Sequence, residues 1–312
     1  MGAKDNAQKD FFDDNKRFAD LYNGIMFQGK PIIKAVELEE ADPNIVYWAE
    51  KKHAEIIPDK VKKWRGAHLA ILTLENQSKV DYSMVFRAMK TEVLNYDKQL
   101  RRKKAKNRRK KQYGNAAEYL CGIRKEEKFI PVIVVVLYLG IDKRWDGATS
   151  LYEMLDMDNR LQPYITNYKL NLYDYHDYDD YSIFKTENRE LFEMLSCSGN
   201  EEKMNALIHR NEDRYSKLDA DATQVINSTV GIEVKTERKK EENGQEVVDM
   251  CKAWDDHWNS GKIEGHTELL LSIISKKIRK NLSLERIAED LEEEVETIRP
   301  IYEKIKGPVQ MV

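Results

Sequence analysis

The stretch that decides the fold is PDKVKKWRGAHLAILTLENQ, residues 58–77. Two short runs, Val61 to Trp64 and Leu69 to Leu74, flank Arg65-Gly66-Ala67-His68, and this pattern predicts an antiparallel hairpin. In such a hairpin, residue i lies opposite residue 134 − i, with Cβ atoms of opposed residues roughly 5 Å apart. The register of the hairpin therefore decides which side chains meet.

Two carboxylates and an amide meet in this register. Asp59 faces Glu75, and Gln77 returns to the same face two residues later, because side chains alternate along a strand, whereas Asn76 points away. Magnesium is a hard ion that takes oxygen ligands and needs few protein carboxylates. We therefore expect Asp59 and Glu75 to hold Mg²⁺ or Mn²⁺.

Length and composition are those of a globular protein. The chain has 312 residues, 34% of them charged and 41% apolar, enough for one large core or two modest ones. No run of 18 apolar residues occurs, so we expect no membrane span. Met1 to Asp10 lacks the apolar segment of a signal peptide. The three cysteines are far apart, which is typical of reduced thiols in a cytoplasmic protein.

The net charge is −3, but basic residues are concentrated in one run from 101 to 111. The nine are Arg101, Arg102, Lys103, Lys104, Lys106, Arg108, Arg109, Lys110 and Lys111. Without them the net charge is −12. The run is either a solvated extension of a helix or an arm that binds phosphates with salt-sensitive, sequence-independent affinity, and we favour the arm. A nuclear-import signal is a third, weaker interpretation.

Periodicity suggests a mixed α/β core. Helices are expected over Phe11 to Phe27 and over Ser78 to about Leu100, each with one apolar stripe. Phe129 to Leu139 is rich in valine and isoleucine, which predicts a central strand covered on both faces. Ile45 to Trp48 fits a short strand or a helical turn, and the pattern does not decide between them.

The following segments are shorter and mostly helical. We expect a short helix over Ser150 to Asp156 and one more strand over Tyr168 to Tyr173. Asp174 to Tyr181 is acidic and tyrosine-rich, and we interpret it as a solvated connector. Helices are then expected over Glu187 to Cys197 and over Glu201 to Leu218.

The C-terminal third is expected to be helical throughout. Arg238 to Gly244 is interpreted as a charged loop, and Ile263 to Lys306 as three helical stretches separated at Asn281-Leu282-Ser283 and about Glu294. This tail fits either a helix-turn-helix or an oligomerisation element. The expected domains are a core over 1–185, a helical extension over 186–260 and the tail over 261–312.

An ordered set of short motifs runs along residues 10–200. Its members are Arg17 to Asn23, Phe27 to Lys30, Pro58-Asp59, Leu74 to Ser78, Asp81, Met84, Phe86-Arg87, Tyr96, Gln99-Leu100, Ile130 to Val132, Tyr138 to Gly140, Trp145 to Gly147 and Ser150 to Tyr152. On these residues the chain resembles the recombination-promoting nuclease (Rpn) family, also described as YhgA-like putative transposases. That family belongs to the PD-(D/E)xK nucleases.

The resemblance implies a fold, an activity and a partner. The fold is α/β, a PD-(D/E)xK restriction-endonuclease-like mixed central sheet flanked by helices, plus an all-helical C-terminal region. The activity is Mg²⁺-dependent endonucleolytic cleavage of DNA, associated with recombination or mobile DNA. The superfamily pattern ends in E-x-K, whereas this chain carries Gln77, and a tyrosine frequent in the family is Thr91 here.

Three further groups complete the candidate site. Gln77 has no useful basicity, so it can only hydrogen-bond the water or the phosphate, and the Asn76 carbonyl is a possible third metal ligand. Asp20 is a candidate outer carboxylate, with a plain surface charge as the alternative. Arg87 is a candidate phosphate clamp, with a salt bridge to Asp81 as the alternative.

Two other classes of function fit the same residues. One is a DNA-binding protein with a degenerate nuclease fold, which the Gln77 position favours. The other is a structural partner in a defence or toxin-like assembly, with homo-oligomers formed through the C-terminal helices.

Overall fold

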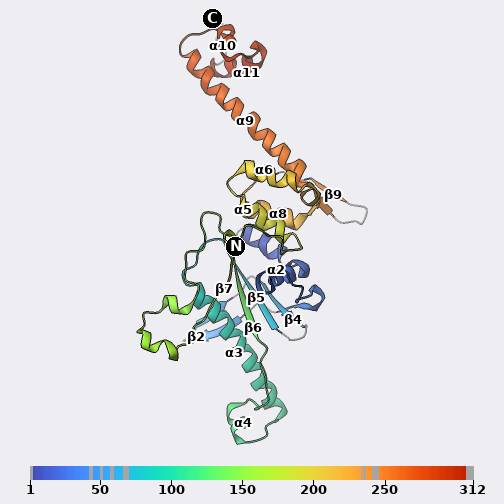
Figure 1. Ribbon diagram of the computed structural model, residues 1–312, viewed down its shortest axis with the longest axis vertical. Helices are drawn as coiled ribbons and strands as arrows, with labels where there is room; N and C mark the ends of the chain where they lie inside the picture. Colours follow the sequence, from blue (N-terminus) through green and yellow to red (C-terminus); the bar gives the residue numbers. More distant parts are fainter. Residues whose placement is uncertain are drawn as a thin grey trace. The chain divides into compact units, whose positions relative to one another are not determined.

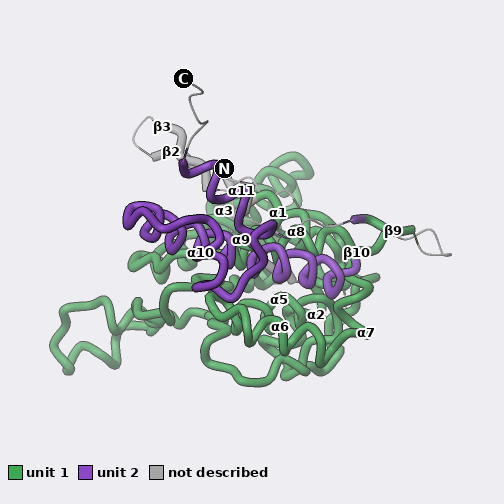
Figure 2. Tube along the Cα trace, turned by 90° about the horizontal axis from the view of Figure 1, so that it is seen from above, with its two compact units in different colours: residues 1–233, 238–248 green, residues 234–237, 249–312 purple. Residues whose placement is uncertain are grey.

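The computed structural model describes residues 3–41, 45–49, 52–56, 60–65, 70–232, 234, 237–240 and 246–306. The chain forms two compact units, which Figure 2 colours separately. Unit 1 is Met1–Glu233 with Arg238–Val248, and unit 2 is Val234–Glu237 with Asp249–Val312. The domain boundaries expected at 185 and 260 remain predictions from the sequence.

Unit 1 is built on a mixed five-stranded sheet in the order β1-β4-β5-β6-β7. Its strands are β1 (Leu38–Glu40), β4 (Lys60–Trp64), β5 (Ala70–Gln77), β6 (Val132–Tyr138) and β7 (Asn171–Asp174). The pairs β1–β4 and β4–β5 are antiparallel, whereas β5–β6 and β6–β7 are parallel. Helices lie on both sides of the sheet, as parallel strands require (Figure 1). The expected mixed α/β class is confirmed in these general terms.

Helix α3 (Met84–Lys110) covers one face of the sheet (Figure 1). Met84 and Ala88 pack against Val134 and Val136 of β6, and all four are buried. The predicted central strand is thus confirmed as β6. The buried side chains by which α3 contacts the sheet lie in the N-terminal half of the helix. The C-terminal half of α3 therefore extends beyond the sheet.

The opposite face is covered by aromatic side chains of α2 (Asn15–Phe27) and α5 (Asn188–Ser196). The ring centroid of Tyr173 in β7 lies 5.7 Å from that of Phe184 and 5.1 Å from that of Phe192 in α5. The ammonium of Lys62 in β4 lies 5.4 Å from the centroid of Phe18 in α2. These contacts place α2 and α5 on the side of the sheet away from α3.

The N-terminal helix begins later than predicted. Phe11 closes a separate helix, α1 (Ala3–Phe11), and α2 starts at Asn15 because the Asp14 carboxylate caps it. Asp14 accepts hydrogen bonds from the Lys16 and Arg17 amides at 2.7 and 2.9 Å, which is the usual role of aspartate at an N-cap.

Several local predictions change in the structure. The undecided segment Ile45–Ala49 is strand β2, and Glu201 to Leu218 is split into two helices rather than one. Arg238–Lys240, expected in a loop, is strand β9. The other elements of unit 1 are η1 (Ala35–Glu37), β3 (Lys52–Ile56), α4 (Ala116–Cys121), η2 (Leu151–Met154), η3 (Asn159–Tyr164), η4 (Tyr175–Asp177), α6 (Glu201–Arg210), α7 (Glu212–Tyr215), β8 (Leu218–Asp219), α8 (Ala220–Val230) and β10 (Glu246–Val248).

Unit 2 contains α9 (Met250–Ile278), α10 (Leu284–Leu291) and α11 (Val295–Lys306). The breaks fall where the sequence predicts them. Ile274 of α9, Ile287 of α10 and Ile298 of α11 are fully buried against one another, so the ends of the three helices share one small core.

Candidate functional site

The β4–β5 hairpin has the register predicted from the sequence. Val61 pairs with Thr73, and Lys60 pairs with Leu74. Asp59 lies just outside the described residues, and so does the side chain of Glu75, whereas the backbone of β5 is described through Gln77. The antiparallel pairing that the prediction needs is therefore present up to the residue next to Asp59.

The carboxyl ends of three parallel strands meet at one edge of the sheet. Gln77 of β5 is in register with Tyr138 of β6, and Tyr138 with Asp174 of β7. Side chains in register on parallel strands share a face, and here it is the face that α3 covers. The edge beyond the carboxyl ends of parallel strands is where α/β sheets usually bind ligands.

Asp174 organises the loops at this edge and was missed by sequence reasoning. Its side chain is 2% exposed and accepts hydrogen bonds from the Trp145 amide at 2.7 Å and the His176 amide at 3.0 Å. The same carboxylate contacts His176 Nδ1 at 2.6 Å. Asp174 thus joins the loop after β6 to the loop after β7.

The interpretation of Asp174 to Tyr181 as a solvated connector is wrong at both ends of the segment, whereas residues 177–180 between them are exposed. Tyr175 and Tyr181 are buried, and the Tyr181 hydroxyl donates to the Tyr175 carbonyl at 2.8 Å. Burial raises the pKa of Tyr181 to about 12. Only Tyr173 and Tyr175 are two positions apart and β7 ends at Asp174, so the sequence carries no clear local signal for the burial of these tyrosines.

Lys62 does not replace the lysine missing at position 77. It is in register with Leu72, five residues before Gln77, so Lys62 and Gln77 lie on opposite faces. The Lys62 ammonium is fully buried and donates to Asn15 Oδ1 at 2.6 Å and contacts Glu40 at 2.9 Å. These contacts make it an anchor between β4, β1 and α2.

Asp20 is buried and is not the surface charge that was its alternative. Its carboxylate accepts hydrogen bonds from the Lys185 and Thr186 amides at 2.9 and 3.0 Å. The Thr186 hydroxyl and Asn188 Nδ2 donate to the same oxygen at 2.7 and 3.2 Å. Every one of these donors lies in the segment that starts α5, so Asp20 ties α2 to that segment.

Arg87 forms the salt bridge that was the alternative to a phosphate clamp. Its guanidinium contacts the Asp81 carboxylate at 2.8 Å, and the Arg87 side chain is 45% exposed. Asp81 also accepts from the Ser83 amide and hydroxyl, so the pair orders the turn between β5 and α3.

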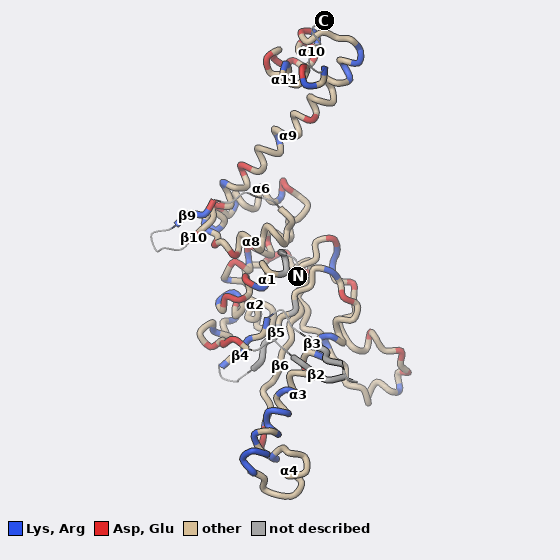
Figure 3. Tube along the Cα trace, turned by 180° about the vertical axis from the view of Figure 1, so that it is seen from behind, with Lys and Arg blue, Asp and Glu red and all other residues tan. Residues whose placement is uncertain are grey.

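The basic run at 101–111 forms the last turns of α3 and its C-cap residue Lys111, and these turns project away from the sheet with α4 at their end (Figures 1 and 3). Eight of the nine side chains are exposed; Lys103 is half-buried over the Phe129 ring. Arg101 is paired with Asp97 at 2.5 Å. Arg108 and Arg109 contact no acidic side chain within the described part of the chain, so they present free positive charge.

Two acids near this basic run, Glu118 and Glu127, accept hydrogen bonds from backbone amides. Glu127 accepts from the Arg124 amide at 3.0 Å and from buried Asn107 at 2.7 Å. Glu118 accepts from the Lys125 and Gly114 amides at 3.0 and 2.7 Å. These backbone hydrogen bonds hold the pKa of both carboxyls below the usual range.

Comparison with models of protein families identifies the family of the chain. Residues 60–225, more than half of the chain, match the model described as "Putative transposase, YhgA-like". The chain belongs to this YhgA-like family. No curated protein and no solved structure matches it. The family description associates the chain with mobile DNA and DNA processing.

The YhgA-like match covers most of the candidate residues. Glu75, Gln77, Arg87, the basic run of α3 and Asp174 lie within it, whereas Asp20 and Asp59 precede it. Among the described residues, no three His, Cys, Asp or Glu side chains are grouped as metal ligands, and Asp59 and the Glu75 side chain were not in that search. No described helix is both long and apolar enough to cross a bilayer.

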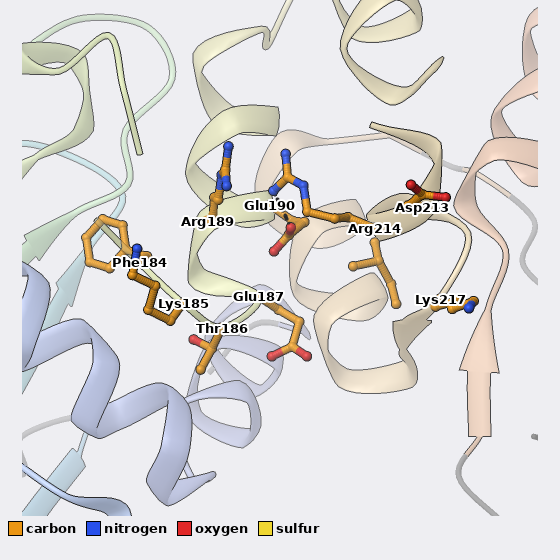
Figure 4. Close-up of a pocket in the computed structure, with 10 residues that line it drawn as sticks. Phe184, Lys185, Thr186, Glu187, Arg189, Glu190, Asp213, Arg214 and Lys217 are labelled. Carbon is orange, nitrogen blue, oxygen red and sulfur yellow. Dashed lines mark hydrogen bonds and ion pairs between the residues drawn. The ribbon is translucent and has the colours of Figure 1, made fainter. Parts of the chain in front are cut away.

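A separate cleft of about 400 Å³ lies beside the start of α5 (Figure 4). It is lined by Phe184, Lys185, Thr186, Glu187, Arg189, Glu190, Asp213, Arg214, Lys217 and Leu218. Arg214 contacts Glu190 at 2.5 Å and Glu193 at 2.8 Å. Burial raises the pKa of Glu190. Because these charges satisfy one another, Arg214 holds α5 and α7 together rather than offering a free cation to a ligand.

Proposed function

We propose that this YhgA-like protein is a metal-dependent nuclease that hydrolyses phosphodiester bonds of DNA. The observation that carries the proposal is the register of β4 and β5. Continued by one pair beyond Lys60–Leu74, it sets Asp59 opposite Glu75. The alternation of the strand then puts Gln77 on the same face, at the carboxyl edge of the sheet.

The donor set at this position suits magnesium or manganese. The carboxylates of Asp59 and Glu75 would hold the ion, with the backbone carbonyl of Asn76 as a further oxygen. When bound, such an ion neutralises charge on the phosphoryl oxygens and lowers the pKa of its water. The partly exposed position of Gln77 supports access of a substrate to this edge.

Gln77 acts as a hydrogen-bonding group and not as a base. Its amide orients the attacking water or a phosphoryl oxygen, but an amide does not accept a proton near neutral pH. Lys62 is held on the other face of the sheet, so it does not supply the missing charge. Proton removal falls to solvent, and cleavage is therefore expected to increase with pH.

The basic end of α3 brings the DNA to an otherwise acidic protein. Its exposed side chains, Arg108 and Arg109 among them, are suited to phosphate contacts that release counterions and weaken with salt. Nothing in this contribution depends on base identity. The same residues support the second candidate function, a protein that binds DNA but cuts it poorly.

Nicking of supercoiled plasmid tests the proposal. Wild type is expected to nick in Mg²⁺ or Mn²⁺ and to stop in chelator, and Asp59→Ala and Glu75→Ala are each expected to lose roughly a hundredfold or more, since outer-shell partners of a metal alone are worth about 10–100-fold. Asp179→Ala, which removes an exposed acid elsewhere in unit 1, serves as the matched control. Nicking that survives in Asp59→Ala would place the activity in a different site. DNA binding by wild type without any nicking would support the second candidate.

A further inference from the structure

The far end of α3 carries an exposed apolar tip. In α4, Tyr119 is 69% exposed and Leu120 is 84% exposed. Burial is the usual fate of large apolar side chains, and a pair so exposed within one short helix is suited to contact with a partner. Figure 1 shows that α4 lies at the end of α3 away from the sheet.

The surroundings of this tip are strongly basic. Residues 101–129 contain twelve lysines and arginines against three acids. Two of those acids, Glu118 and Glu127, bind backbone amides of the loop, as described above. A polyanion is therefore the partner whose charge fits the surface around Tyr119 and Leu120.

The tip is held in place by the loop that returns from it. Asn107, which is 2% exposed, donates to the Gly122 carbonyl at 3.2 Å and to Glu127 at 2.7 Å. Asn115 caps α4 by accepting from the Glu118 amide at 3.0 Å. Gly122 has a φ of +75° and lies against the Lys104 side chain. These contacts tie α4 to the end of α3, so the apolar pair is presented from a fixed position.

We propose that Tyr119 and Leu120 form a wedge that contacts bases of DNA while the basic end of α3 holds its phosphates. This inference rests on DNA being the partner in the proposed function, but it does not require cleavage. Proteins that bend DNA insert apolar side chains between base steps in this way. A tyrosine also stacks on unpaired bases of any sequence.

A lipid surface fits the tip less well. Stable membrane attachment takes two signals, for example one acyl chain together with a polybasic patch, because a single myristoyl chain alone binds only marginally. Tyr119 and Leu120 together offer two side chains, one of them ending in a hydroxyl. Apolar side chains inserted between base steps are, in contrast, sufficient to unstack and kink a duplex.

The test compares two double variants of the full-length protein in chelator, where no cleavage occurs. Tyr119→Ser with Leu120→Ser removes the wedge. Tyr164→Ser with Leu161→Ser is the matched control, because η3 exposes a tyrosine and a leucine by 86% and 50% away from the basic run. Affinity is measured over a range of salt for a duplex that contains 2-aminopurine, whose fluorescence increases when it unstacks.

The wedge variant is expected to lose about 5- to 150-fold in affinity, together with the fluorescence increase. Its salt dependence should match wild type, because its phosphate contacts remain. Arg108→Gln with Arg109→Gln should instead reduce the slope of log K against log salt by about 1.8. A thermal melt of each variant confirms folding, since all these side chains are exposed.

Three results would overturn the wedge. One is wild-type affinity and fluorescence in the wedge variant. Another is an equal loss in the η3 control. The third is a variant that binds DNA normally but no longer binds vesicles of phosphatidylserine, which would assign the tip to lipid. Loss of nicking in Asp59→Ala with DNA binding unchanged does not contradict the wedge. The nuclease proposal and the wedge proposal can therefore fail separately.

Discussion

Replacing Asp20 with asparagine tests whether this carboxylate is a structural tie or a functional ligand. Asp20 is 8% exposed, and its oxygens accept from two amides, one hydroxyl and one side-chain amide of the segment that starts α5. Asparagine keeps the shape of the side chain but replaces one acceptor with an NH₂ group. The variant therefore loses charge and places a donor against donors.

The expected cost follows from these contacts. Hydrogen bonds to a charged group are worth about 1.5–3 kcal/mol and neutral ones about 0.5–1.5, and an unsatisfied buried donor costs a further 1–3 kcal/mol or so. Since several bonds weaken and one conflict arises, Asp20→Asn should lower the free energy of unfolding by about 3 kcal/mol. For a unit of this size that corresponds to a melting temperature about 6–12 °C lower.

Urea unfolding and thermal melts of the full-length chain, followed by circular dichroism, measure this loss. Asp81→Asn is the matched control, because Asp81 also caps a turn and pairs with Arg87 but does so near the surface, where the loss should stay below about 1 kcal/mol. A loss for Asp20→Asn no larger than for Asp81→Asn would refute the argument. Normal stability with a weakened dependence of nicking on Mg²⁺ would show instead that Asp20 is a metal ligand.

Two further predictions concern the packing of α2 and the pH dependence of the α3–α4 loop. A Cβ at Gly24 would lie 2.2 Å from Phe184 Cε1. Gly24→Ala should therefore lower the free energy of unfolding by about 1–2 kcal/mol in a urea titration, although alanine favours the helix. An unchanged urea midpoint would mean that Phe184 moves freely. Backbone hydrogen bonds hold the pKa of Glu118 and Glu127 low, so their contribution to the loop is complete above the unfolded pKa of about 4.3 and is lost as the pH falls through the lower folded value. Protection of the Gly114 and Lys125 amides from hydrogen exchange, corrected for intrinsic rates, should therefore fall in acid. In Glu118→Gln one carbonyl oxygen can accept from only one of these amides, so total protection near neutral pH should be lower than in wild type and should not fall in acid; equal protection in the variant would contradict this account.

Local patterns in the sequence were sufficient to predict the hairpin. Alternation on either side of Arg65 to His68 gave the pairing of Val61 with Thr73, and the valine-rich run gave β6. Both depend on neighbours within a few residues. The start of α2 after Asp14 could also have been predicted, because an aspartate before a helical run is an N-cap signal.

Contacts between distant segments were not predictable in this way. Asp20 meets Lys185 across 165 positions, and neither residue carries a local signal of the other. Likewise, the burial of Tyr173 depends on the parallel pairing of β7 with Leu137 of β6. Tertiary packing determines the burial of Asp20 and Tyr173. It also determines the role of Asp174 at the edge of the sheet, which the sequence did not predict.

Under the proposed function, the length of α3 sets how far from the candidate site the protein contacts DNA. Helix α3 begins at Met84, seven residues after Gln77, and its 27 residues span about 40 Å, close to twelve steps of a DNA strand at roughly 3.4 Å each. Protection by the protein should therefore be lopsided, reaching about one helical turn to one side of the nick. Four residues inserted after Asp97 would shift the outer boundary by about two base pairs and rotate the tip by only about 40°, whereas two inserted residues would turn it by about 200° and away from the duplex.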